Sequence, residues 1–436
     1  MLRSYKAIKI SLHTGIRQIQ TWMRSSVKAG FFITLILIFL GSGEIYSQSG
    51  PGSPYSFFGI GTINEGGTGI NKILGGSGIG VRDSLSLNLK NPAAYSAIHP
   101  AFTQVTASGF DFNLLNLKTD QGRSLYTDFL FSGINLWVRP FNKAGVNLGI
   151  MPYSVVRYDI KSVNTLYGLP GEYTVNYKGS GGITRLYFGA GYEIVRNLSL
   201  GANVSYYFGA INHDRDVSTS DNLNNFSIVE KTYLHAINFD YGLQYRINMG
   251  RNKLMLGLTY QGEKQFRGKY NFSISSTADT LAQALPEVTN YYLPSLYGGG
   301  IEFLIHDRLL FTGEYQLGRW RSQTLTSGYT IGDGSRISFG LMKLVQPTVE
   351  SPFQVQSFGL GGYYQQNYLQ FNGNPINEFG ISAGIRVMTL GRSMLEFTYQ
   401  TSFKGYDLGA QIQESRNRIS LSFSLFDIWF IRRKIE

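Results

Sequence analysis

The sequence predicts an all-β fold, a transmembrane antiparallel β-barrel of about 14 strands. Three observations indicate this fold: apolar and polar residues alternate, charged residues are few, and the connections between strands alternate between short and long. The 436 residues include 52 Gly, 29 Tyr and 29 Phe, and only 15% are charged, against roughly 25% in soluble domains. Few charges and many aromatic residues are typical of strands whose outer face contacts lipid.

Residues 1–47 have the pattern of an export signal peptide. Six basic residues precede the apolar run at 31–40, and cleavage is expected after the small residue Ser47. A membrane anchor is the alternative, but the run is short for a span. Removing six basic residues and Glu44 leaves 33 of 39 basic and 27 of 28 acidic residues. These charges are scattered, so nucleic-acid binding is not expected.

The stretch 237–248 shows the alternation most clearly. One face carries the apolar side chains Ile237, Phe239, Tyr241, Leu243, Tyr245 and Ile247. The other face carries Asn238, Asp240, Gln244 and Arg246, which we expect to face the lumen. Such polar residues either select solutes or form a network that fills the barrel, and Arg386 and Glu396 belong to the same set. A strand of twelve residues that is tilted by about 45° spans roughly 30 Å, which is the apolar thickness of a membrane.

The predicted connections set the number and direction of the strands. Short ones are expected at 139–143, 196–197, 249–252, 306–308, 347–352 and 389–391, and long polar ones near 114–125, 161–170, 213–225, 276–292, 321–334, 366–375 and 404–415. Fourteen strands lie between them. Short periplasmic turns, long outer loops and an even strand number are typical of bacterial outer-membrane barrels. We therefore expect a Gram-negative outer-membrane protein with both mature termini in the periplasm.

The Gly-rich stretch 48–100 does not follow the strand pattern. It precedes the first convincing strand, so we expect it to fill the lumen as a hatch, with the barrel at 101–436. A dinucleotide loop at 75–83 is excluded because Val81 stands where the third glycine is needed. The absence of Cys excludes disulfides and Cys-based metal sites.

Other motifs give no sign of catalysis. The stretch 212–216 offers His213 and two Asp residues for a metal, but a solvated outer loop is the favoured interpretation, because no recognised ligand spacing is present. Pro152 marks either a break in the wall or a strand end. We expect no cofactor, no metal and no enzyme activity.

The stretch 73–98 resembles the N-terminal hatch of the FadL/OMPP1/TodX outer-membrane transport family. The positions that carry the likeness are Gly75, Gly76, Asp83, Asn91, Pro92 and Ala93. The stretch 291–320 is similar to the family's Leu-Pro, strand, turn, strand, Trp unit, and the C-terminal "FDIWFIRRKIE" looks like barrels of this kind from Bacteroidota.

This resemblance implies a hatch-gated channel for passive uptake of hydrophobic compounds, such as long-chain fatty acids or aromatic hydrocarbons. It also implies a kinked strand beside a gap in the wall, for which Pro152 is the candidate. The alternative is a non-transporting barrel that binds partner proteins in an outer-membrane secretion or assembly complex. Expected partners are outer-membrane lipid and lipopolysaccharide, a hydrophobic small molecule, and a protein of such a complex.

Overall fold

The computed structural model describes residues 52–64, 67–119, 122–165, 172–219, 225–276, 280–285, 290–325, 328–345, 353–389, 393–406 and 412–427. The predicted signal peptide at 1–47 lies outside these ranges. Within them, no helix has the length and apolar character needed to cross a bilayer.

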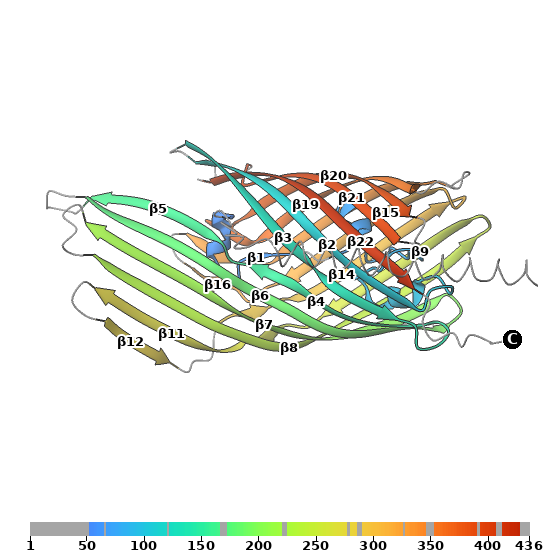
Figure 1. Cartoon of the computed structure of the whole chain (residues 1–436), viewed down its shortest axis with the longest axis horizontal. Coiled ribbons are helices and arrows are strands. Elements are labelled where there is room, and N and C mark those ends of the chain that lie inside the picture. Colours follow the sequence, from blue (N-terminus) through green and yellow to red (C-terminus); the bar gives the residue numbers. More distant parts are fainter. Residues whose placement is uncertain are drawn as a thin grey trace, which may run out of the picture. The chain divides into compact units, whose positions relative to one another are not determined.

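The wall is a closed barrel of fourteen antiparallel strands, which confirms the predicted fold class (Figure 1). It runs through β2 (Gln104–Thr119), β3 (Gly122–Val138), β4 (Ala144–Val155) with β5 (Tyr158–Thr165), β6 (Glu172–Val195), β7 (Leu198–Thr219) and β8 (Phe226–Met249). It continues through β9 (Asn252–Gln261) with β11 (Arg267–Ser276) as one strand and β12 (Thr280–Leu285) with β14 (Ser295–Ile305) as the next. Between these segments, β10 (Lys264–Gln265) and β13 (Tyr292–Leu293) pair with each other as a separate two-stranded sheet. It ends with β15 (Leu309–Arg319), β18 (Gly334–Leu344), β19 (Phe353–Phe371), β20 (Asn374–Thr389), β21 (Ser393–Lys404) and β22 (Ile412–Asp427). The last strand closes on the first, from Gln104 opposite Asp427 to Thr119 opposite Ile412.

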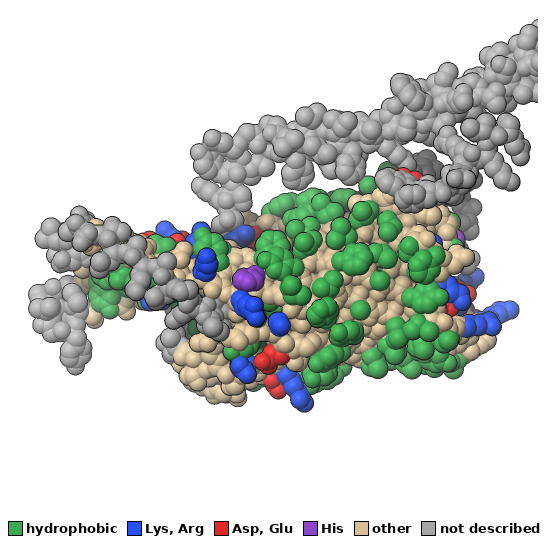
Figure 2. Space-filling model, turned by 90° about the horizontal axis from the view of Figure 1, so that it is seen from below, with side chains coloured by type: hydrophobic (Ala, Val, Ile, Leu, Met, Phe, Trp, Pro, Cys, Tyr) green, Lys and Arg blue, Asp and Glu red, His purple; other side chains and the backbone are tan. Residues whose placement is uncertain are grey.

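The two faces of the wall differ as the alternation predicts. Apolar side chains point outward and are exposed, as Phe239, Leu258 and Ile301 illustrate, and they spread over the outer surface in Figure 2. Polar side chains such as Asn203, Gln244 and Glu396 are buried. A barrel with an apolar outside and a polar inside matches a lipid surround.

Several expected outer loops are instead continuations of the strands, so that part of the prediction is wrong. β7 runs to Thr219 and β8 starts at Phe226, inside the expected loop 213–225. β19 and β20 meet at the two-residue turn 372–373. At about 3.3 Å per residue, the 24 residues of β6 extend roughly 55 Å when tilted by 45°, well beyond a membrane's apolar layer. Together with β6, the strands β5, β7 and β8 extend far to the left in Figure 1.

The N-terminal segment packs against the inner face of the wall with little regular structure. It contains η1 (Pro54–Phe57), β1 (Thr62–Ile63), α2 (Gly69–Ile73) and η2 (Pro92–Ala97), and β16 (Gln323–Thr324) and β17 (Tyr329–Ile331) lie in the connection after β15. Pro54 and Pro92 start the two 3₁₀ turns, and Thr68 starts α2 through a capping box with Asn71. Ile70, Ile73 and Leu87 are buried.

Candidate functional site

The Asn-Pro-Ala turn rests on a row of glycines in the wall. Gly191, Gly201 and Gly242 pair with one another across β6, β7 and β8, and a Cβ atom on any of them would collide with Asn91 or Pro92. Asn91 accepts a hydrogen bond from the Ala93 amide at 3.1 Å and donates to the Ile79 carbonyl at 2.9 Å. Asn91 therefore caps η2 and joins two parts of the hatch segment.

The Gly75-Gly76 turn lies against the opposite side of the barrel. Both residues have positive φ, +67° and +91°, which glycine adopts without strain. A Cβ atom on Gly75 would strike the backbone of Gly362 in β19. The Arg336 guanidinium donates to the Gly75 carbonyl at 3.0 Å, so the turn is fixed to β18 as well.

Ion pairs with largely buried side chains connect the hatch segment to several strands. They join Lys72 to Asp111 of β2 at 2.6 Å, Asp83 to Arg386 of β20 at 2.6 Å, Lys90 to Glu314 of β15 at 3.1 Å, and Arg82 to Glu193 of β6 at 3.7 Å. Burial lowers the pKa of Arg82 to about 10, and that of Lys72 also falls, for the same reason. A hatch segment held by charges on four strands resists small displacements, because a shift that breaks a pair before water can enter leaves a charge without its partner.

Glu314 is the most connected of these wall residues, and its removal tests the attachment. Its carboxylate accepts hydrogen bonds from the Gly78 and Ile79 amides at 2.6 and 2.8 Å and pairs with Lys90. We expect Glu314→Ala to destabilise the closed form by about 3–5 kcal/mol, since it strands a buried ammonium. The measurement is urea-induced unfolding with trypsin cleavage of the hatch segment. Glu263→Ala, which removes an exposed carboxylate 3.8 Å from Arg321, should change neither the urea-induced unfolding nor the trypsin cleavage. Equal behaviour of the two variants would contradict the role of Glu314 in attaching the hatch segment to the wall.

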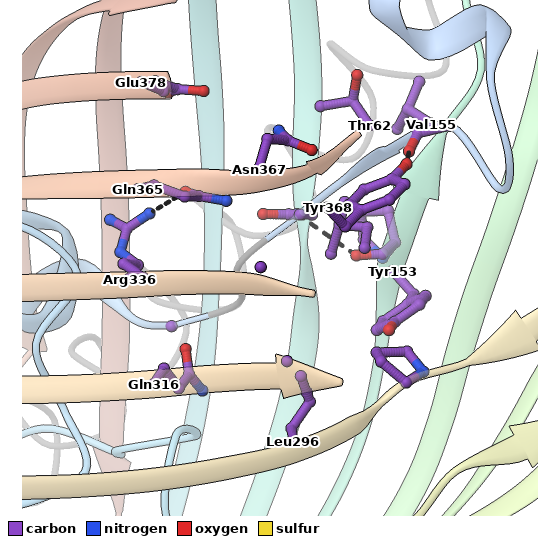
Figure 3. Close-up of a pocket in the computed structure, with 18 of the residues that line it drawn as sticks. Thr62, Tyr153, Val155, Leu296, Gln316, Arg336, Gln365, Asn367, Tyr368 and Glu378 are labelled. Carbon is purple, nitrogen blue, oxygen red and sulfur yellow. Dashed lines mark hydrogen bonds between the residues drawn. The ribbon is translucent and has the colours of Figure 1, made fainter. Parts of the chain in front are cut away.

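A cavity of about 330 Å³ lies beside η1 and β1. Figure 3 shows Arg336, Gln365 and Glu378 at one end, and Tyr153, Tyr368 and Leu296 at the other. The charged lining is largely paired, since Arg185 binds Asp240 and Arg157 binds Asp128. The cavity therefore has a polar end and an aromatic end rather than a uniformly apolar lining.

The four polar residues predicted for the lumen lie at different levels of β8. Asp240 lines the cavity, and Asn238 donates to the Gly262 carbonyl at 2.8 Å. Gln244 donates to the Ile79 and Val81 carbonyls at 3.0 and 3.1 Å, so it holds the hatch segment. Arg246 is partly exposed, 3.9 Å from Glu193.

Pro152 lies where the wall separates. β3 pairs with β4 only between Ile134–Val138 and Val146–Ile150. Beyond this, β4 has a register shift between Pro152 and Ser154 against β6, and the free edge of β4 takes up β1, with Thr62 opposite Val155. Bulges bend strands, so Pro152 marks a seam between β3 and β4–β5. Residues from both sides of this seam line the cavity.

The stretch 212–216 lies inside β7, so its interpretation as a loop is wrong. The His213 Nδ1 atom is 2.6 Å from the Tyr158 hydroxyl, and no cluster suited to a metal ion occurs among the described residues. Sequence reasoning also missed three wall residues that attach the hatch segment: Glu314, Asp111, and Glu302, whose carboxylate accepts a hydrogen bond from the Arg82 amide at 2.9 Å. Lone acidic residues at inward positions of apolar strands are the signal that indicates them.

A filled lumen, an apolar exterior and a closed wall define an outer-membrane β-barrel. The chain belongs to the BamG family, whose model matches residues 30–436. No curated protein matches it.

Solved structures resemble the fold. The Ralstonia pickettii toluene transporter TbuX has 14% identity and a TM-score of 0.58 over 84% of this chain and 99% of that chain. The CymD monoaromatic hydrocarbon channel has 14% identity and a TM-score of 0.54, with coverage of 83% and 98%. A Pseudomonas aeruginosa FadL homologue has 14% identity and a TM-score of 0.54, with coverage of 84% and 99%. At this identity the likeness concerns the fold.

Proposed function

We propose that the chain is a closed barrel that binds partner proteins as a subunit of an outer-membrane secretion or assembly complex. The observation that carries this proposal is the attachment of the hatch segment to β2, β6, β15 and β20 by buried ion pairs. Opening such a hatch would separate several buried charges. Passive passage of an apolar compound supplies no interaction that would offset this cost, whereas a rigid, filled barrel suits a scaffold.

The lining of the cavity supports the same proposal. An apolar solute moving through it would have to pass the charged side chains of Arg336, Arg185 and Asp240, which it cannot hydrogen-bond. In this proposal Gly75, Gly76, Asp83 and the Asn-Pro-Ala turn fix the hatch rather than gate it. The proposal also keeps both mature termini in the periplasm, in line with an even number of strands, and lipid and lipopolysaccharide around the apolar wall. It keeps a source of Bacteroidota type on the likeness of the C-terminal sequence.

A hatch-gated channel for hydrophobic compounds is the second candidate. It is favoured by the cavity, which reaches the seam beside Pro152 and has aromatic residues such as Tyr153 and Tyr368 at one end. Proteins named as a toluene transporter and a monoaromatic hydrocarbon channel share the fold. In this candidate, movement of the hatch would admit a ligand to the cavity, and the ligand would then leave sideways through the seam.

Uptake and copurification separate the two candidates. Full-length protein in liposomes should take up radiolabelled toluene or palmitate no faster than protein-free liposomes. The same protein, extracted from its native membrane in mild detergent, should carry other polypeptides in fixed stoichiometry. Uptake proportional to the amount of barrel, together with purification as a single polypeptide, would favour the channel and overturn the proposal.

A further inference from the structure

The seam leaves two strand edges open above its base. Among the described residues, 122–133 of β3 pair with β2 alone, and β5 pairs with β6 alone. The edges diverge because both strands are bulged: Ser132 is the extra residue in β3, before Gly133 with φ +114°, and Tyr153 is the extra residue in β4. In Figure 1, β3 and β5 spread apart toward their outer ends.

The base of the seam already holds an added strand. β1 hydrogen-bonds to the edge of β4 that β3 has left, with Ile63 opposite Ser154, and the Asn64 amide donates to the Tyr153 carbonyl at 2.8 Å. This edge of the wall therefore accepts an extended polypeptide that does not belong to the barrel. Such strand addition is a common mode of peptide recognition, in which backbone hydrogen bonds provide affinity.

Above β1, an ion pair joins the two sides of the seam. Asp128 of β3 binds Arg157, which follows β4, and the Ser56 hydroxyl of η1 donates to the Arg157 carbonyl at 2.9 Å. Closer to the tips, no strand of the described chain lies on either edge. β5 pairs with the part of β6 that lies beside His213 to Thr219 of β7, so its free edge lies above the apolar layer, where an incoming strand can replace water as the hydrogen-bond partner of the backbone groups.

The side chains along the open edges suit a strand with two unlike faces. On the outside of the barrel, Leu125 and Phe129 of β3 are 63% and 56% exposed, whereas the outward side chains of β5 are Asp159, Lys161, Val163 and Thr165. On the inside, Tyr126 and Asp128 line the cavity. The outward face of a partner strand in the seam would therefore meet apolar side chains of β3 on one side and the charges of Asp159 and Lys161 on the other, and its inward face would meet polar groups of the cavity.

We propose that the seam between β3 and β5 is a docking site for an extended segment of a second polypeptide, which adds to the wall above β1 as a strand of about eight residues, the length of β5. This proposal rests on the proposed function and assigns the partner's binding mode. The ladder that β1 begins on β4 would continue on β5, and the apolar face of the added strand would lie beside Leu125 and Phe129.

Site-directed photocrosslinking in the native outer membrane tests this proposal. A benzophenone amino acid at Leu125, and separately at Val163, should crosslink to one and the same short segment of a single protein, as mapped by peptide mass spectrometry. The same probe at Ile337, an equally exposed residue on β18 at a distance from the seam, should not reach that segment. Crosslinks from Leu125 and Val163 to lipid alone, or to unrelated segments, would overturn the proposal.

Hydrogen exchange supplies the second readout. Amides in 123–132 and 158–165 should exchange at least tenfold more slowly in the copurified complex than in the isolated barrel, while the paired amides of β18 stay unchanged. Equal exchange in both samples would overturn strand addition. If the probe at Ile337 crosslinks to a protein and the probes in the seam crosslink only to lipid, the proposed docking site is wrong but the partner-binding function stands. If no probe crosslinks to a protein and the barrel transports toluene, the proposed function is wrong as well.

Discussion

Deletion of residues 52–98 is expected to convert a closed barrel into a conducting pore. The deletion removes η1, β1, α2 and η2 together with every ion pair between the hatch segment and the wall. The wall should survive, because water entering the lumen would hydrate Asp111 and Glu314 rather than leave them buried without partners. A polar lumen of fourteen strands without its filling is wide enough for water and small ions.

Single-channel recording in planar bilayers measures this effect. The full-length protein should be silent or nearly so, and the deletion variant should show stable open steps at least tenfold larger. Heat-modifiable migration on gels checks that the variant is a folded barrel. A folded variant with unchanged conductance would mean that the hatch segment does not close the lumen.

The barrel could be predicted from the sequence because each strand faces two different environments. Lipid on one side and polar groups on the other impose a period of two that runs through Ile237 to Ile247 without interruption. The same physics explains the wrong loops. Above the membrane, both faces of a strand meet water, so the outer half of β7 carries His213, Asp214 and Arg215 and its composition is that of a loop.

The connections within the lumen could not be predicted because they depend on register and on closure. Lys90 and Glu314 are far apart in the chain, and nothing near either residue identifies the other. The row of glycines beneath the Asn-Pro-Ala turn could not be predicted for the same reason. Gly191, Gly201 and Gly242 become one surface only when β6, β7 and β8 are aligned. The Asn-Pro-Ala motif was visible in the sequence, but the surface on which it packs was not.

The Leu243→Arg variant is expected to assemble poorly. Leu243 is on the outward face of β8, paired with Leu200 of β7 and Leu258 of β9, and it lies roughly 14 Å above the end of β8 if the strand tilts by 45°. That depth is near the middle of the apolar layer, where Arg on the lipid face costs about 2–4 kcal/mol. The fraction of heat-modifiable barrel after refolding into vesicles should fall severalfold. Val229→Arg, on the same strand near its outer end, should assemble normally because its guanidinium would lie in water; equal yields from both variants would mean that the apolar face of β8 does not contact lipid.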